Sequence, residues 1–88
     1  MKDPTADTRR AELEFLRAEL TTGLTLSRIA LDAKDEDKID RNRINARKAY
    51  DSILHYMPKT FLPTPEWEEI KSRLAQLKAE LKLLGEDI

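Results

Sequence analysis

Apolar side chains recur at helical spacing near the C-terminal end of the chain. They are separated by alternating gaps of three and four residues, and they are Trp67, Ile70, Leu74, Leu77, Leu81 and Leu84. Residues spaced in this way fall on one face of an α-helix. Thr64 as N-cap and Pro65 at the first helical position favour a start, and Gly85 favours a stop. The pattern therefore predicts a helix over residues 65–84 with one apolar face that other segments must cover.

Residues 8–34 also follow a helical pattern, but this segment has two apolar stripes. The first stripe contains Leu13, Leu16, Leu20, Leu24 and Leu31, with Gly23 and Ser27 set into it. The second lies roughly half a turn away and contains Phe15, Ala18, Leu26, Ile29 and Ala33. A helix that is apolar on two sides needs two coverings. Residues 1–7 are polar and contain Pro4, so we expect them to fray, with the cap left open among Asp3, Thr5, Asp7 and Thr8.

A third helix is predicted over residues 36–57, with Asp35 or Asp37 as its N-cap. Its core stripe consists of Ile39, Ala46, Ala49, Tyr50, Ile53, Leu54 and Met57. Pro58 ends this helix, because a proline disfavours the helical conformation in the residue before it. The connection over residues 59–63 is short and apolar in its middle, so Phe61 and Leu62 are expected to close one end of the core.

Helices joined by short turns must alternate in direction, so we expect one domain over residues 8–88, an all-α three-helix up-down-up bundle. The apolar stripe of the middle helix breaks between Ile39 and Ala46. In an antiparallel arrangement this break faces similar breaks in the other two helices. We therefore expect one polar layer, with Glu80 as the acid that pairs with Arg43. Its members are Ser27, Asn42, Arg43 and Glu80. Gly23 would face Ala46 and Ala49, where small residues permit a close helix approach.

Length and charge limit the functions that this chain can have. Its 88 residues allow one small core. Sixteen basic and 17 acidic residues give a net charge near −1, so no overall field attracts nucleic acid or an anionic membrane. The lack of cysteine excludes disulfides, zinc–thiolate sites and thiol catalysis. The first residues lack the apolar core of a signal peptide and no run reaches transmembrane length, so we expect a cytoplasmic protein without membrane contact.

Two constellations suggest chemistry, and neither is convincing. His55 follows Asp51 by one helical turn and could form an acid–base pair or half a metal site. A solvated histidine on a polar face explains it better, because no second histidine or acid cluster supports it. The acidic residues around the first turn lack the glycine and the glutamate that a calcium-binding loop requires. We therefore predict no catalytic, metal or cofactor site and no enzymatic activity.

Nucleic-acid binding is the alternative function. Basic and amide side chains of the base-reading kind gather on the middle helix, and they are Arg41, Asn42, Arg43, Asn45, Arg47 and Lys48. The helical pattern places Arg43 and Arg47 beside the core and leaves Arg41, Asn45 and Lys48 on one outer face. The nearly neutral chain disfavours this alternative further.

The run Ala46-x3-Tyr50-x2-Ile53-x4-Pro58 resembles the second helix of a tetratricopeptide repeat. It is also similar to the middle helix of the microtubule-interacting-and-trafficking type of three-helix domain. These families imply a helical peptide-binding module without catalysis. Ile53 stands where a tetratricopeptide repeat usually has alanine, and no site residue follows from the resemblance.

The second stripe of the first helix is the most informative feature for function. It could pack against the third helix, because each helix of a three-helix bundle touches two neighbours. Bundle neighbours normally occupy adjacent flanks, however, and Phe15, Leu26 and Ile29 lie nearly opposite Leu13, Leu20 and Leu24. An exposed row of this kind would mark an interface. We therefore expect a protein-interaction or self-association module, whose partner is either a second copy, as in a homodimer, or the helix of another protein.

Overall fold

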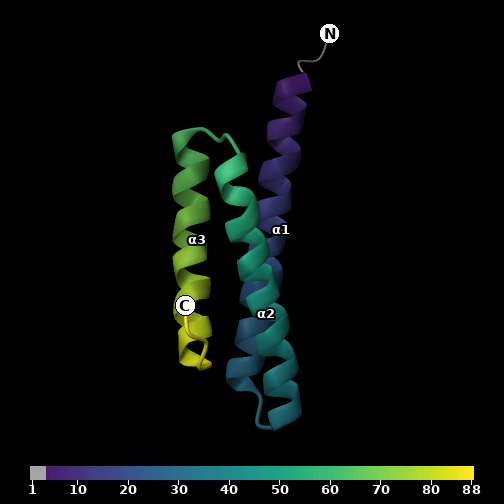
Figure 1. Ribbon diagram of the computed structural model, residues 1–88, viewed down its shortest axis with the longest axis vertical. Helices are drawn as coiled ribbons and strands as arrows, with labels where there is room; N and C mark the ends of the chain where they lie inside the picture. The colour runs from purple at the N-terminus through teal and green to yellow at the C-terminus, as the bar shows by residue number, and fades with distance from the viewer. Residues whose placement is uncertain (1–3) are drawn as a thin grey trace.

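The computed structural model describes the backbone of residues 4–88 and the side chains of residues 7–88. Its elements are α1 (Pro4–Asp32), α2 (Glu36–Tyr56), the short 3₁₀ helix η1 (Met57–Lys59) and α3 (Thr64–Leu83). The three long helices run up, down and up again (Figure 1). Within the described residues there is no strand. The predicted all-α three-helix bundle is therefore confirmed.

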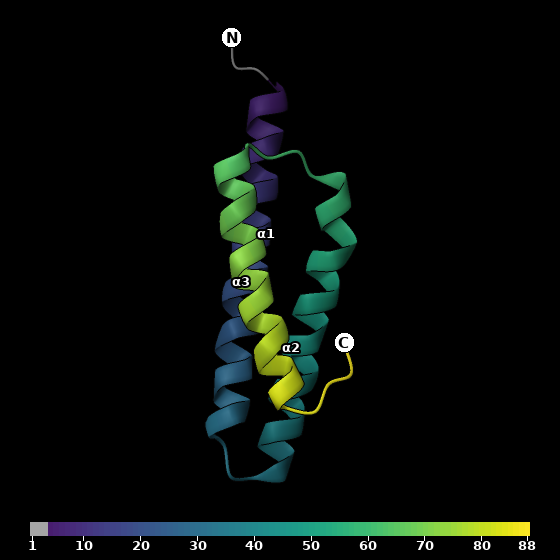
Figure 2. The same cartoon turned by 90° about the vertical axis from the view of Figure 1, so that its left-hand side faces the viewer.

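The first helix is longer than its apolar pattern predicts. It begins at Pro4 rather than near Thr8, so residues 4–7 are helical and their predicted fraying is wrong. A proline fits this first position because its fixed φ suits a helix and its missing N–H would have no partner there. Thr5, Asp7 and Thr8 thus lie inside the helix, while Asp3 lies outside the described residues. The first turns of α1 extend beyond the ends of α2 and α3 (Figures 1 and 2).

The starts of α2 and α3 follow different rules. At α2, the Asp35 carboxylate accepts a hydrogen bond of 3.1 Å from the backbone N–H of Lys38, which identifies Asp35 rather than Asp37 as the N-cap. Thr64 is not the N-cap of α3. The helix already includes Thr64, and the N-cap is Pro63, whose carbonyl accepts from the backbone N–H of Trp67 at 3.1 Å.

The end of α3 turns the chain back towards α2. Gly85 has a φ of 97°, a left-handed conformation that glycine adopts without strain. The N–H of Gly85 donates to the carbonyl of Lys82, and the N–H of Glu86 donates to the carbonyl of Leu81, both at 3.0 Å. This pair of bonds is a Schellman motif. It directs the last residues towards α2 (Figure 2), and Ile88 packs against the hydrophobic core.

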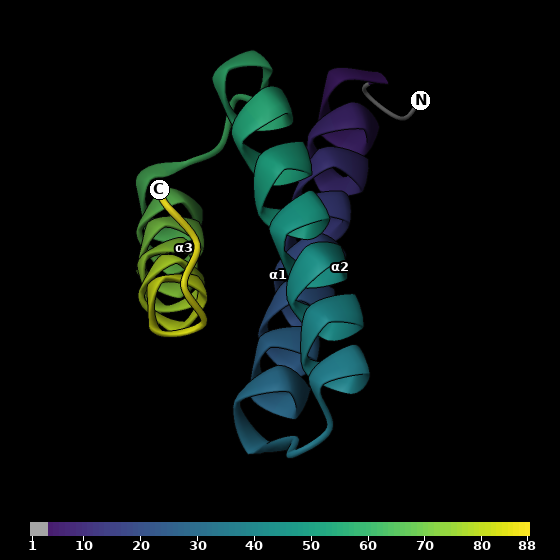
Figure 3. The same cartoon turned by 60° about the horizontal axis from the view of Figure 1, so that its bottom comes forward.

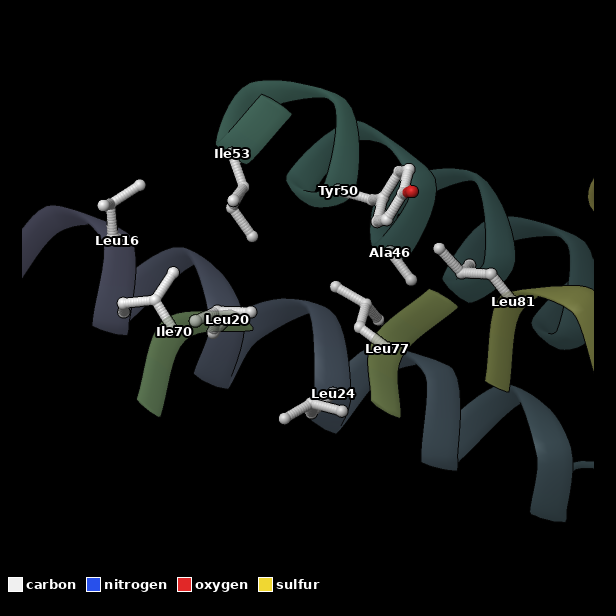
Figure 4. Packing of buried hydrophobic residues seen from close by; sticks show 9 residues of the cluster. All are labelled: Leu16, Leu20, Leu24, Ala46, Tyr50, Ile53, Ile70, Leu77 and Leu81. Carbon is white, nitrogen blue, oxygen red and sulfur yellow. The ribbon is translucent and has the colours of Figure 1, made fainter. Parts of the chain in front are cut away.

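All three helices contribute to the core (Figure 4). The buried cluster consists of Leu16, Leu20, Leu24, Ala46, Tyr50, Ile53, Ile70, Leu77 and Leu81. Trp67, Leu74 and Leu84 are partly buried against it, which confirms the predicted stripe of the third helix.

Three residues expected in the core are exposed instead. Phe61 is 79% exposed because it projects from the connection at the end of the bundle, where only Leu62 packs inward. Leu54 is 45% exposed on the flank of α2 that faces α3, and these two helices contact each other little. Leu31 is 39% exposed in the last turn of α1, and Ala30 is buried in its place.

The first helix is the central element of the bundle. It contacts both α2 and α3 extensively, whereas α2 and α3 contact each other much less, which Figure 3 shows as a separation between them. Arg17 of α1 faces α3, where its guanidinium donates to both oxygens of Glu69 at 2.7 Å. Phe15 lies on the flank towards α2, with its ring centroid 5.1 Å from that of Tyr56. The two neighbours thus occupy adjacent flanks of α1 and leave its opposite face uncovered.

Gly23 permits the close approach of all three helices at the middle of the bundle. A Cβ atom added there would lie 2.6 Å from Leu77 Cδ2 of α3 and 3.4 Å from Ala49 Cβ of α2. The first distance is much shorter than an ordinary carbon–carbon contact. The predicted approach to Ala49 is confirmed, and Leu77 is the additional residue that fills the space above the glycine.

The contact between Arg17 and Glu69 makes stability depend on pH. The hydrogen bonds from Arg17, helped by its charge and opposed by partial burial, lower the pKa of Glu69 below its usual value of 4.5. Because the folded-state pKa is depressed, the stabilisation is complete above 4.5 and is lost as the pH falls through the lower folded value. We expect Glu69→Gln to destabilise the protein at neutral pH but not in strong acid. Urea unfolding over a pH series measures this, and equal pH profiles of the two proteins would contradict it.

Candidate protein-interaction surface

The uncovered face of α1 carries a continuous row of uncharged residues. They are spaced by alternating gaps of three and four, and they are Thr8, Ala11, Phe15, Ala18, Thr22, Thr25 and Ile29. All seven are exposed, although 38% of the chain is charged and the outer faces of the other helices carry many of those charges. We call this row the outer seam of α1. Its spacing is that of the contact positions in paired helices.

The outer seam differs in part from the second stripe predicted from the sequence. Phe15, Ala18 and Ile29 belong to both. Leu26 instead packs against the core, and Ala33 is half-buried, because α2 covers the edge of the stripe that contains them. The predicted stripe is therefore neither wholly covered nor wholly exposed.

Four seam residues were not predicted from the sequence, namely Thr8, Ala11, Thr22 and Thr25. The search was for large apolar residues, and threonine and alanine give little signal of that kind. The signal that would find them is the absence of charge at seven successive seam positions in a highly charged helix.

An open hollow of about 510 Å³ adjoins the start of the seam. It exists because α1 continues beyond the end of α2, so that only one side of the overhanging turns is covered. Its lining consists of Thr8, Ala11, Glu12, Phe15, Tyr56 and Thr60. The rings of Phe15 and Tyr56 meet edge to face, at 79° between their planes. Such aromatic pairs gain attraction beyond their buried area, so they give the hollow a well-ordered wall.

The wall is held from the α2 side by local contacts. The Thr60 hydroxyl donates to the carbonyl of Tyr56 at 2.9 Å, which ties η1 back to the last turn of α2. The ring of His55 lies edge-on to Tyr56, with 4.8 Å between the centroids. Even so, Phe15 and Tyr56 remain 40% and 44% exposed. The hollow thus offers ordered aromatic surface to a partner side chain, which is a common feature of protein interfaces.

The predicted polar layer divides into two separate sets of contacts. Ser27 Oγ lies 3.1 Å from Glu80 Oε2 and also 3.1 Å from the carbonyl of Leu24. The other carboxylate oxygen of Glu80 accepts from Arg28 Nε at 3.4 Å. These contacts join α1 to α3. Asn42 takes no part in them, because its amide donates to the carbonyl of Lys38 in its own helix at 2.8 Å.

Arg43 pairs with Glu86 rather than with Glu80, so the predicted partner is wrong. Arg43 Nη1 donates to Glu86 Oε2 at 3.0 Å, and Arg47 Nη1 lies 3.6 Å from the other oxygen of that carboxylate. The reason is geometric: Glu80 faces α1, while the turn at Gly85 returns Glu86 to α2. The arginine contacts therefore fasten the C-terminal residues to α2.

The other sequence-based candidates do not form sites. Asp51 accepts a hydrogen bond from Arg47 Nε at 3.0 Å, while His55 Nε2 lies 3.3 Å from Lys59 Nζ. Nowhere among the described side chains do three histidine or carboxylate groups gather where they could hold a metal ion. On the basic face of α2, these ion pairs occupy Arg43 and Arg47, which leaves only Arg41 and Lys48 of the four basic side chains fully exposed.

Comparison with protein-family models, curated proteins and solved structures finds no match for this chain. Within the part of the chain that the structure describes, no helix is long and apolar enough to span a lipid bilayer. The outer seam and its hollow are therefore the observations on which a function can be based.

Proposed function

We propose that this chain is a non-enzymatic protein-interaction module that binds a helix along the outer seam of α1. The observation that carries the proposal is the row of seven exposed, uncharged residues at the spacing of paired helices. A solvated helix face is normally charged, as the exposed faces of α2 and α3 are. A seam without charge can exclude water against a partner at no cost of desolvating an ionised group.

The shape of the seam supports a helix as the binding element. Ala11 and Ala18 flank Phe15 along the seam, so small side chains alternate with one large ring. Small residues allow a second helix backbone to come near, and the ring would fit between side chains of that helix. A partner side chain entering the hollow would cover the exposed faces of Phe15 and Tyr56. Burial of aromatic surface of this kind dominates the energy of many interfaces.

The proposal assigns no catalytic role to His55. Its expected partner Asp51 is bonded to Arg47, so the acid–base pair suggested by the sequence is not formed. The resemblance of residues 46–58 to helical peptide-binding modules agrees with the proposal but remains a prediction. A cytoplasmic location and self-association also remain predictions.

Substitution within the seam tests the proposal. We expect Ala18→Arg to leave the fold intact, because residue 18 is exposed and arginine favours helix. The same change should abolish association, because a long charged side chain would stand between the two helices. Sedimentation of the protein alone and with synthetic amphipathic helical peptides of basic, neutral and acidic character provides the measurement. Ser72→Arg on the exposed face of α3 is the matched control.

The native protein and the Ser72→Arg control should associate with a second copy or with at least one peptide, and Ala18→Arg should not. The proposal fails if the native protein binds neither itself nor any peptide. It also fails if Ala18→Arg associates as strongly as the control does.

A further inference from the structure

The edges of the outer seam are acidic over its N-terminal half. In a heptad pattern the contact positions are flanked on both sides, and those flanks commonly carry the charges that select a partner. Here Asp7 and Glu14 border one edge of the seam, and Glu12 and Glu19 border the other. Asp7 and Glu14 are exposed, and Glu12 and Glu19 are half-buried on the side of α2. From Thr8 to Thr22 the surface is thus an uncharged strip between two acidic edges.

The basic residues of the same turns do not neutralise these edges by position. Arg9 and Arg10 lie on other faces of α1, and Arg9 lines a separate hollow with Phe61. Arg17 is directed at α3, where Glu69 accepts two hydrogen bonds from it. The acidic edges therefore face the space that a partner helix would occupy.

A second copy of the chain suits this surface poorly. In a parallel pair of α1 helices, Asp7 would face Glu12 and Glu14 would face Glu19 of the other copy. In an antiparallel pair, the edge that carries Glu12 and Glu19 would face the same edge of its partner. Both directions bring carboxylates together, and like charges across an interface oppose association.

We propose that the natural occupant of the outer seam is an amphipathic helix of another protein, with lysine or arginine on both sides of its apolar stripe. This inference rests on the proposed function and specifies the partner. The basic side chains would pair with the acidic edges, while medium-sized apolar side chains would cover Ala11 and Ala18. Glu12 also lines the hollow, so a partner residue near Phe15 meets an aromatic wall and a carboxylate together.

Two synthetic helical peptides test the charge requirement. They share one leucine and alanine stripe, and their flanking positions carry lysine in one peptide and glutamate in the other. Titrated into the native chain at low salt, the lysine peptide should bind at least about tenfold more tightly, the combined effect of several exposed ion pairs. This preference should shrink at high salt because exposed charges are screened.

A charge-neutralising variant locates the effect on the seam edges. The triple variant Glu12→Gln, Glu14→Gln and Glu19→Gln should lose most of the preference for the lysine peptide. Its control removes the same number of charges at exposed positions elsewhere, through Glu36→Gln, Glu68→Gln and Asp87→Asn. Circular dichroism checks that both variants keep their helix content. The control should retain the preference.

The outcomes separate this inference from the proposed function. If both peptides bind equally, or if the triple variant and its control lose the same affinity, the basic-helix inference is overturned while the seam remains a binding surface. Dimerisation of the native chain that Ala18→Arg abolishes has the same consequence, because the occupant is then a second copy. A monomer that binds neither peptide overturns both proposals.

Discussion

Replacing Leu77 by alanine is expected to lower the free energy of unfolding by about 3 kcal/mol, within the range observed for buried leucines. Leu77 is fully buried, and it packs among residues of all three helices (Figure 4). The truncation leaves a cavity where α3 meets α1, and a small domain has few other contacts with which to compensate. The loss is a large share of the roughly 4–13 kcal/mol expected for a chain of this length.

Denaturant unfolding followed by circular dichroism measures this loss. Gln76→Ala, one residue away on the exposed side of α3, is the control and should change stability by no more than about 0.5 kcal/mol. Equal effects of the two substitutions would mean that Leu77 is not at the centre of the core.

The second large effect is expected from Gly23→Leu, which should destabilise the protein by about 3 kcal/mol, at the upper end of the range for overpacked cores. Even a single added carbon would lie 2.6 Å from Leu77 Cδ2 and 3.4 Å from Ala49 Cβ. A whole leucine side chain would have to push α3 away from α1. The higher helix propensity of leucine, worth roughly 1 kcal/mol over glycine, offsets only part of this cost.

A double-mutant cycle identifies the cause. In the Leu77→Ala background, Gly23→Ala gains the space that the native leucine occupies, and it should then stabilise the helix by up to about 1 kcal/mol. In the native background the same alanine meets Leu77 and should be clearly less favourable. If Gly23→Ala has the same effect in both backgrounds, contact with Leu77 is not the reason for the glycine.

Local patterns predicted the bundle well because its helices obey local rules. The apolar spacing from Trp67 to Leu84, the cap at Asp35 and the left-handed Gly85 each depend on residues within a few positions of one another. The prediction failed where distant segments decide the outcome. Leu54 is exposed because α2 and α3 diverge, and Glu86 takes Arg43 because of a turn more than one helix away.

The candidate surface was predictable only in part for a related reason. Periodicity placed Phe15, Ala18 and Ile29 on a face that a bundle need not cover, and the structure finds all three exposed. It could not show that α2 covers Leu26, because that depends on which flank of α1 the second helix occupies. The acidic edges become meaningful only once the uncovered face is known.

The central claim is that the outer seam of α1 receives a basic amphipathic helix, and mapping the bound lysine peptide by nuclear magnetic resonance tests it most directly. In the isotope-labelled native chain, the backbone amide signals of Ala11, Ala18 and Thr25 should shift on titration. Those of Gln76 and Ala79, on the exposed face of α3, should not. Shifts confined to α2 and α3, or no shifts at saturating peptide, would contradict the account.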